Sequence, residues 1–436
     1  MTSERQLTHG KLGDIKINLG RILLFFLYGC TFLAFLSKSA WTLTGPIMAV
    51  LCAFLYFAGY AEAVTALIIV ANDAMGTILG GSISFPYLLL ILAVARLVLY
   101  KRRVTREEPV LLLASLILLI ELDAVGLIEF RNVIYSMSYI LGLLALPRDS
   151  ETTHRVARGI IAAMSFIALH AILTGGVEYT EVEVTGMFSS ETVVRYGVLG
   201  TGSGDPNLSS FLINTGLACT LGDRRMHWLW KLGLSLLFLL TLTVTVSVSG
   251  LLAAACVLVL FILIGNRASR GIAILGFALL ALVVGFELYI GLPSTMRNPM
   301  LDGYIIRVED ALGKAASGDI VGATTNRASI LSYYLRYIVD QTPVRFLFGG
   351  NSLKAPGRGM PHNTYVGLVL QVGAVGALAL LSWIFWRIVQ NLRANRSDVC
   401  RKRNLLLKGL SLFMAFTLSF YEGSLWALWM YFVILL

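Results

Sequence analysis

Charged side chains are scarce in this sequence. Asp, Glu, Lys and Arg make up 14% of its 436 residues, whereas soluble domains average about 25%. Hydrophobic residues make up 57% and the mean hydropathy is +0.78. Too few polar groups are present to cover the surface of a globular protein. The composition therefore argues against a soluble protein and predicts an all-α chain whose helices mostly face lipid.

Cysteine and histidine are also rare, with five of each. No two cysteines have CxxC spacing, which argues against a zinc site or a disulfide framework. The sequence contains no HExxH and no DxD motif, and we find no paired carboxylates in the segments expected to lie outside the membrane. The sequence therefore predicts no metal and no cofactor.

Apolar runs long enough to cross a bilayer, about 20 residues each, recur along the chain. We expect a polytopic bundle of 12 to 14 transmembrane helices. The run at 62–81 is the weakest, because it contains Asn72, Asp73 and several glycines. The runs lie near 20–38, 43–60, 62–81, 84–100, 108–127, 130–147, 158–175, 206–221, 229–248, 250–265, 272–292, 363–388, 404–420 and 422–436.

The formal net charge is +10, and its distribution follows the runs. If each run crosses once, all the basic clusters fall on one side, which the positive-inside rule makes the cytoplasm. This placement explains the basic charge without a nucleic-acid partner and puts the amino terminus inside. The clusters are Lys11/Lys16/Arg21, Lys101–Arg103 with Arg106, Arg148/Arg155/Arg158, Arg224/Arg225/Lys231, Arg267/Arg270, and the segment from Arg387 to Lys408.

Two long connections remain on the outer side, at 176–205 and 293–361. They divide the chain into an amino-terminal bundle (1–292), a large outer loop (293–361) and carboxy-terminal helices (362–436). The large loop holds eight basic and five acidic residues, a net charge of +3 (8 − 5). Arginine forks bind phosphate groups in a bidentate manner, so this surplus favours a site for an anionic group.

Within the large loop, residues 326–343 have the pattern of an amphipathic helix. Ile330, Tyr334, Leu335 and Ile338 recur at helical spacing, with Asn326 as N-cap and Pro343 as the stop. We expect this helix to lie on the outer membrane surface with Arg327 at its start and to be one of several amphipathic helices in the loop.

The shorter connection contains "VVRYGVLGTGSGDPN" (193–207). Its glycines permit close approach to a ligand, although they also simply make turns. Arg195 is its one basic residue, and the turn ends in Asp205-Pro206-Asn207. Arg195 is therefore a candidate anion ligand.

His362 stands where the large loop meets an apolar run. Pro361 precedes it and Asn363 follows. An imidazole at a helix N-terminus tends to stay neutral, and a neutral imidazole can act as a general base. At about 3.6 residues per turn, Gly373 and Gly376 fall below His362 on nearly the same face, where a lipid tail or a neighbouring helix can pack closely.

The pattern His362-Asn363, nine residues, Gly373, two residues, Gly376 resembles the signature of the bacterial O-antigen ligase and O-antigen polymerase superfamily. Arg327, Pro343 and "FLFGGN" (346–351) before it, and the "GDPN" turn after Arg195, also resemble that family. The Ser-Arg-Gly of many members is absent, because this chain reads Ser247-Val248-Ser249-Gly250.

The resemblance implies a metal-independent glycosyltransferase of the type C membrane architecture in the bacterial inner membrane, with its active site facing the periplasm. The donor would be a glycan on an undecaprenyl pyrophosphate carrier. The acceptor would be a second glycan for a polymerase, or lipid A–core for a ligase. By the resemblance His362, Arg195 and Arg327 are catalytic, with Arg307 a further pyrophosphate ligand and Asn363, Asp205, Asn207, Gly373 and Gly376 in the substrate site.

The "GDPN" loop favours a polymerase over a ligase. A lipid-linked oligosaccharide flippase or another transporter is the alternative of a different class. It predicts a charged path through the helices, whereas the charges inside the runs are scattered. They are Glu62, Asp73, Arg96, Asp123 and Glu422.

Overall fold

The described part of the chain consists of helices and one β-hairpin. The computed structural model describes residues 19–36, 41–74, 84–100, 113, 116, 130–147, 150–174, 177–184, 190–197, 206–223, 225–244, 248–264, 313–314, 316–318, 327–350 and 363–394. The helices are α1 (Leu19–Leu36), α2 (Trp41–Phe57), α3 (Ala61–Ala74), α4 (Phe85–Leu99), α6 (Phe130–Leu144), α7 (Ser150–Thr174), α8 (Pro206–Gly222), α9 (Trp228–Val244), α10 (Val248–Ile264), α14 (Arg327–Val339), α15 (Pro343–Phe348) and α16 (Thr364–Ala394). The hairpin is formed by β1 (Val177–Val184) and β2 (Ser190–Gly197).

Two described helices are long and apolar enough to cross a membrane. They contain the segments Glu151–Leu173 in α7 and Tyr365–Trp383 in α16, of 23 and 19 residues. Shorter apolar segments of 10–17 residues occur in α1, α2, α3, α4, α6, α8 and α9. The described helices from α1 to α10 and α16 coincide with apolar runs of the sequence, whereas the runs at 108–127, 272–292, 404–420 and 422–436 lie largely or wholly outside the described residues.

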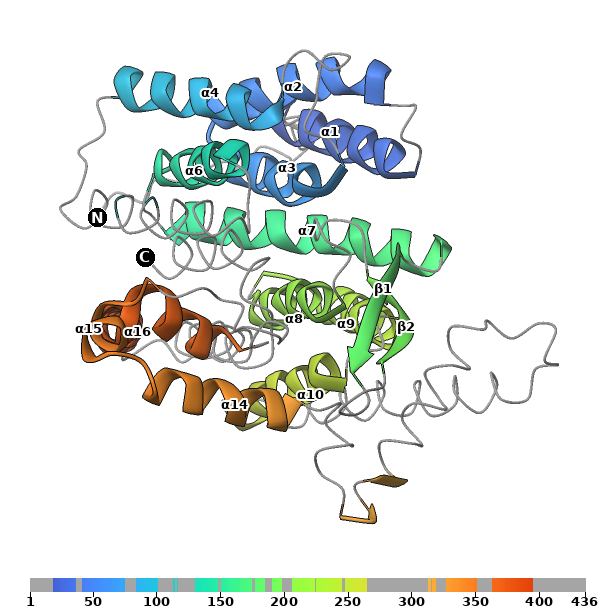
Figure 1. Cartoon of the computed structure of the whole chain (residues 1–436). Coiled ribbons are helices and arrows are strands. Elements are labelled where there is room, and N and C mark those ends of the chain that lie inside the picture. The colour runs from blue at the N-terminus through green and yellow to red at the C-terminus, as the bar shows by residue number, and fades with distance from the viewer. Residues whose placement is uncertain are drawn as a thin grey trace, which may run out of the picture.

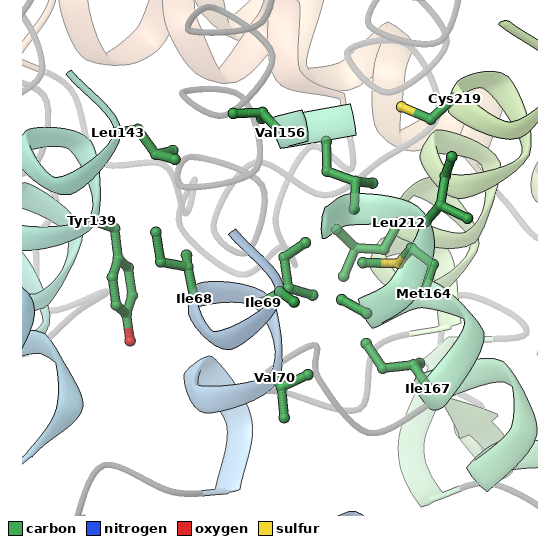
Figure 2. Packing of buried hydrophobic residues seen from close by; sticks show 14 of the residues in the cluster. Ile68, Ile69, Val70, Tyr139, Leu143, Val156, Met164, Ile167, Leu212 and Cys219 are labelled. Carbon is green, nitrogen blue, oxygen red and sulfur yellow. The ribbon is translucent and has the colours of Figure 1, made fainter. Parts of the chain in front are cut away.

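The core is centred on α3, the run that the sequence marked as weakest. Every residue from 61 to 70 is buried. Figure 1 shows α3 beside α6, with α1 above it and α7 below it, and α3 packs extensively on α7. In Figure 2, Ile68, Ile69 and Val70 of α3 lie between side chains of α6 and those of α7 and α8. A helix buried on all sides needs no polar face, which fits the mostly apolar residues 61–70, where Glu62 and Thr65 are the buried polar exceptions.

Glycines allow several of these helices to approach each other closely. A Cβ at Gly142 would lie 2.8 Å from the Leu89 side chain of α4, and one at Gly216 would lie 2.7 Å from Met164 of α7. A Cβ at Gly159 of α7 would lie 2.6 Å from the backbone oxygen of Glu62 in α3. Small residues at such crossings are typical of helix packing in membranes.

Gly159→Ala is expected to destabilise the protein by about 1–3 kcal/mol, because a backbone oxygen cannot turn away as a side chain can. Gly233→Ala in α9 is the matched control, since no atom lies within 4 Å of its added Cβ. The control should be neutral or slightly stabilising. Thermal unfolding of both variants in the same detergent checks this, and equal losses of stability would contradict the α3–α7 contact.

Helix ends from five parts of the chain meet at one end of the bundle. Arg96 of α4 donates to the carbonyl of Tyr56, and Arg155 of α7 donates to the carbonyl of Gly59 over 2.7 Å. Both arginines thus satisfy carbonyls at the carboxyl end of α2. At the same end Gly20 of α1 abuts Tyr60, and Lys231 of α9 donates to Leu221 of α8 over 3.2 Å. The hairpin follows the opposite end of α7 (Figure 1).

Candidate functional site

Arg195 lies on a β-strand. β1 and β2 pair antiparallel, and the register sets Arg195 opposite Tyr179. The prediction of an all-α fold is therefore wrong for this connection. A strand was indicated by "VEYTEVEV" (177–184), where β-branched and aromatic residues dominate. The glycines further along the connection favoured a loop instead.

The hairpin register also corrects the expectation about carboxylates. Glu183 lies directly opposite Glu191, so this outer connection does contain a paired acidic position. The two residues are far enough apart in sequence that only strand pairing brings them together. Among the described residues no group of three or more His, Cys, Asp or Glu is placed to hold a metal ion.

β2 contacts α8, the helix that begins at Pro206. Asn207 lies in the first turn of α8, so the predicted residues Arg195 and Asn207 belong to two elements in direct contact. Further along α8, Asn214 is buried and its side-chain amide donates to the carbonyl of Gly250 in α10 over 2.9 Å. Asp205 and the glycines at 200, 202 and 204 lie outside the described residues.

Arg327 is the first residue of α14, as the sequence predicted. Tyr334 and Ile338 are buried, which confirms two positions of the predicted apolar face, but Leu335 is exposed. The rings of Tyr333 and Tyr337 stack with their centroids 6.5 Å apart. α14 contacts α16, so the helix that carries Arg327 is attached to the helix that follows His362.

The predicted amphipathic helix is α14, but it ends before Pro343 and a second helix follows it. α14 ends at Val339, and Pro343 begins α15 instead of ending a helix. Thr342 caps α15 by accepting from the amide of Arg345 at 3.5 Å. Proline suits the first turn of a helix because its missing N–H would have no helical partner there. The exposed side chains of α15 include Val344 and Phe348, which leaves this short helix with an apolar surface.

Asn363 is the N-cap of α16. Its side-chain oxygen accepts from the amide of Val366 at 3.2 Å, and its carbonyl accepts from Gly367 at 3.0 Å. Capping accounts for an asparagine at this position. His362 is bonded to this cap residue but lies outside the described residues, as does Arg307.

Gly373 interrupts α16. Its backbone has φ +74° and ψ 173°, so two helical segments meet there. The prediction that Gly373 and Gly376 continue three regular turns from His362 is therefore wrong in its geometry. The sequence left open whether a lipid tail or a neighbouring helix packs at these glycines. At Gly373 it is a neighbouring helix, because α15 lies against α16 (Figure 1). At Gly376 an added Cβ would meet Val372 of the same helix.

A cluster of charged residues, which the sequence did not reveal, lies at the amino-terminal end of α7. We call it the α7 charge cluster: Glu151, His154, Arg155, Arg158, Asp223 and Arg225. Asp223 Oδ2 accepts from Arg158 at 3.2 Å, and Asp223 Oδ1 accepts from the amide of Arg225 at 2.7 Å. Glu151 accepts from Arg225 at 2.8 Å and from Arg155 at 3.2 Å. The pairs Arg158–Asp223 and Arg225–Glu151 join residues distant in sequence, so no local motif could have indicated them.

Comparison with known proteins does not identify a family for this chain. No family model, no curated protein and no solved structure matches this chain.

Proposed function

We infer that the chain is a membrane glycosyltransferase that transfers a glycan from an undecaprenyl pyrophosphate carrier to a sugar hydroxyl, and that it polymerises polysaccharide repeat units. The observation that carries this proposal is the start of α16. Asn363 caps the first segment of α16, a helix whose apolar stretch has membrane length but is interrupted at Gly373, and His362 directly precedes this cap in the sequence. A helix N-terminus attracts anions and disfavours protonation of a nearby imidazole, as the reaction requires.

The proposed chemistry is a single displacement. The acceptor hydroxyl oxygen forms a bond to the anomeric carbon as the bond from that carbon to the pyrophosphate oxygen breaks. His362 takes the hydroxyl proton, and the carrier pyrophosphate leaves with the bonding electron pair. Arg195 and Arg327, with Arg307, stabilise the charge that develops on the leaving group.

The meeting of helix ends at one side of the bundle supports a membrane orientation. Arg21, Arg155, Arg158, Arg225 and Lys231 all belong to helix ends on that side. Under the positive-inside rule this side is cytoplasmic. The hairpin with Arg195 then faces the periplasm, where a lipid-linked glycan would be presented in the bacterial inner membrane.

A polymerase and a ligase differ in the acceptor. Purified protein is incubated with a fluorescent lipid-linked repeat unit, with and without lipid A–core, and the products are separated by size. A ladder from the repeat unit alone supports a polymerase. Product only after addition of lipid A–core identifies a ligase, and the polymerase proposal is then rejected.

Arg327→Ala is expected to lower kcat by about 10²–10³-fold, the usual cost of removing one preorganised charge from a developing anion. Arg327→Lys should recover part of the rate, because lysine keeps the charge but not the bidentate fork. Arg336→Ala is the matched control, since Arg336 is exposed in the last turn of the same helix. Steady-state kinetics with the lipid-linked donor distinguish the three variants. Equal effects of Arg327→Ala and Arg336→Ala would exclude a specific role for Arg327.

A further inference from the structure

Three glycines join α15 to the break in α16. Gly349, Gly350 and Gly373 have φ angles of +78°, +81° and +74°. The amide of Gly350 donates to the carbonyl of Gln371 over 2.9 Å. That bond crosses from the end of α15 to the last turn before the break. We refer to these three glycines and Gln371 as the glycine junction.

The junction depends on backbone atoms in direct contact. A Cβ at Gly373 would collide with the carbonyl of Leu347 and lie 2.5 Å from the amide nitrogen of Phe348. A Cβ at Gly349 would collide with the carbonyl of Gln371 and lie 2.5 Å from the amide nitrogen of Gly373. At Gly350 nothing lies within 4 Å. Two of the three positions therefore exclude a side chain by contact as well as by backbone conformation.

The junction fixes one end of the connection that leads to His362. Gly350 precedes this connection and is bonded to Gln371. Asn363 follows it and caps the same helical segment of α16. Gln371 lies eight positions after Asn363 (371 − 363), about 12 Å along a helix at ~1.5 Å per residue. Both ends of the connection are thus attached to one short helical segment.

We propose that the glycine junction holds the end of α15 on the first segment of α16 and thereby makes Gly349, Gly373 and Gln371 positioning residues for the transfer reaction. This inference rests on the function proposed above. Gly373 breaks the helix two residues after Gln371, whose carbonyl accepts from the amide of Gly350. Because a small displacement of a catalytic group can cost about 100-fold in rate, such an attachment matters for kcat more than for donor binding.

The first test needs no activity. Hydrogen–deuterium exchange of the Gly350 amide is measured in wild type, Gly373→Ala, Gly349→Ala and Gly59→Ala. Gly59 is the matched control, because it has a φ of +85° but its added Cβ would have no atom closer than 4.0 Å. Exchange is expected to be at least about 10-fold faster in the two junction variants and unchanged in Gly59→Ala. Wild-type exchange in both junction variants would overturn the proposal.

The second test separates positioning from general loss of stability. In variants matched for thermal stability, Gly349→Ala or Gly373→Ala should lower kcat about 10-fold or more with little change in the KM for the donor, whereas Gly59→Ala should keep both. If Gly373→Ala does not fold, the kcat and KM of Gly349→Ala alone decide whether the junction has a positioning role. An equal fall of kcat in Gly59→Ala would overturn the positioning role. A wild-type protein that transfers no glycan would refute the proposed function, while amide exchange still decides whether the junction forms.

Discussion

His362→Ala is expected to lower the rate of glycan transfer by about 10²–10⁴-fold, the usual contribution of a general base. The acceptor hydroxyl would then lose its proton to water instead of to a positioned imidazole. Binding of the donor should change little, because the arginines proposed to hold its pyrophosphate remain. Single-turnover kinetics with a lipid-linked repeat unit measure the loss directly.

His362→Gln separates the two roles that a neutral imidazole can have. Glutamine can orient the acceptor by hydrogen bonding but cannot take its proton at neutral pH. If His362 is the base, the glutamine variant should be as inactive as the alanine variant. Substantial activity of His362→Gln would show instead that His362 only orients the acceptor.

Asp223→Ala is expected to cause the largest loss of stability among the charged residues of the α7 charge cluster, about 2–3 kcal/mol. The Asp223 side chain is 1% exposed, and it contacts Arg158, His154 and the amide of Arg225. Its removal leaves the half-exposed Arg158 guanidinium and the part-buried amide of Arg225 without their acceptor. Thermal unfolding in detergent measures the effect.

Glu151→Ala is the matched control for Asp223→Ala. Glu151 also pairs with two arginines, but its side chain is 44% exposed. Exposed ion pairs contribute about 1 kcal/mol or less, because water screens the charges. Asp223→Asn should lie between the two, since its amide oxygen can still accept from Arg225. An equal loss in Glu151→Ala and Asp223→Ala would contradict the importance of burial in this cluster.

The helical part of the fold could be predicted because each helix is encoded locally. Apolar runs set the positions of α1, α4 and α10, and Ala61 begins a run apolar enough to form α3 despite Asn72 and Asp73 at its end. At the candidate site, the helix start at Arg327 and the cap at Asn363 were likewise predictable. A cap or an amphipathic period needs only neighbours within a few residues.

The features that could not be predicted depend on contacts between distant residues. The break at Gly373 is visible only once the carbonyl of Leu347 is placed against it, since glycine within an apolar run also suits simple helix packing. Asp223 gains its partners from α7, and Glu183 meets Glu191 only through strand pairing. The hairpin itself was predictable in principle, from the β-branched residues between Val177 and Val184.

The most direct test of the proposed function follows both products of the reaction. Wild-type protein in proteoliposomes is supplied with the lipid-linked repeat unit, and free undecaprenyl pyrophosphate and glycan length are measured together. Glycosyl transfer predicts one carrier released for each new glycosidic bond, with both products lost in His362→Ala. Donor that crosses the bilayer intact, with no carrier released and no longer glycan formed, would contradict the transferase and favour a transporter.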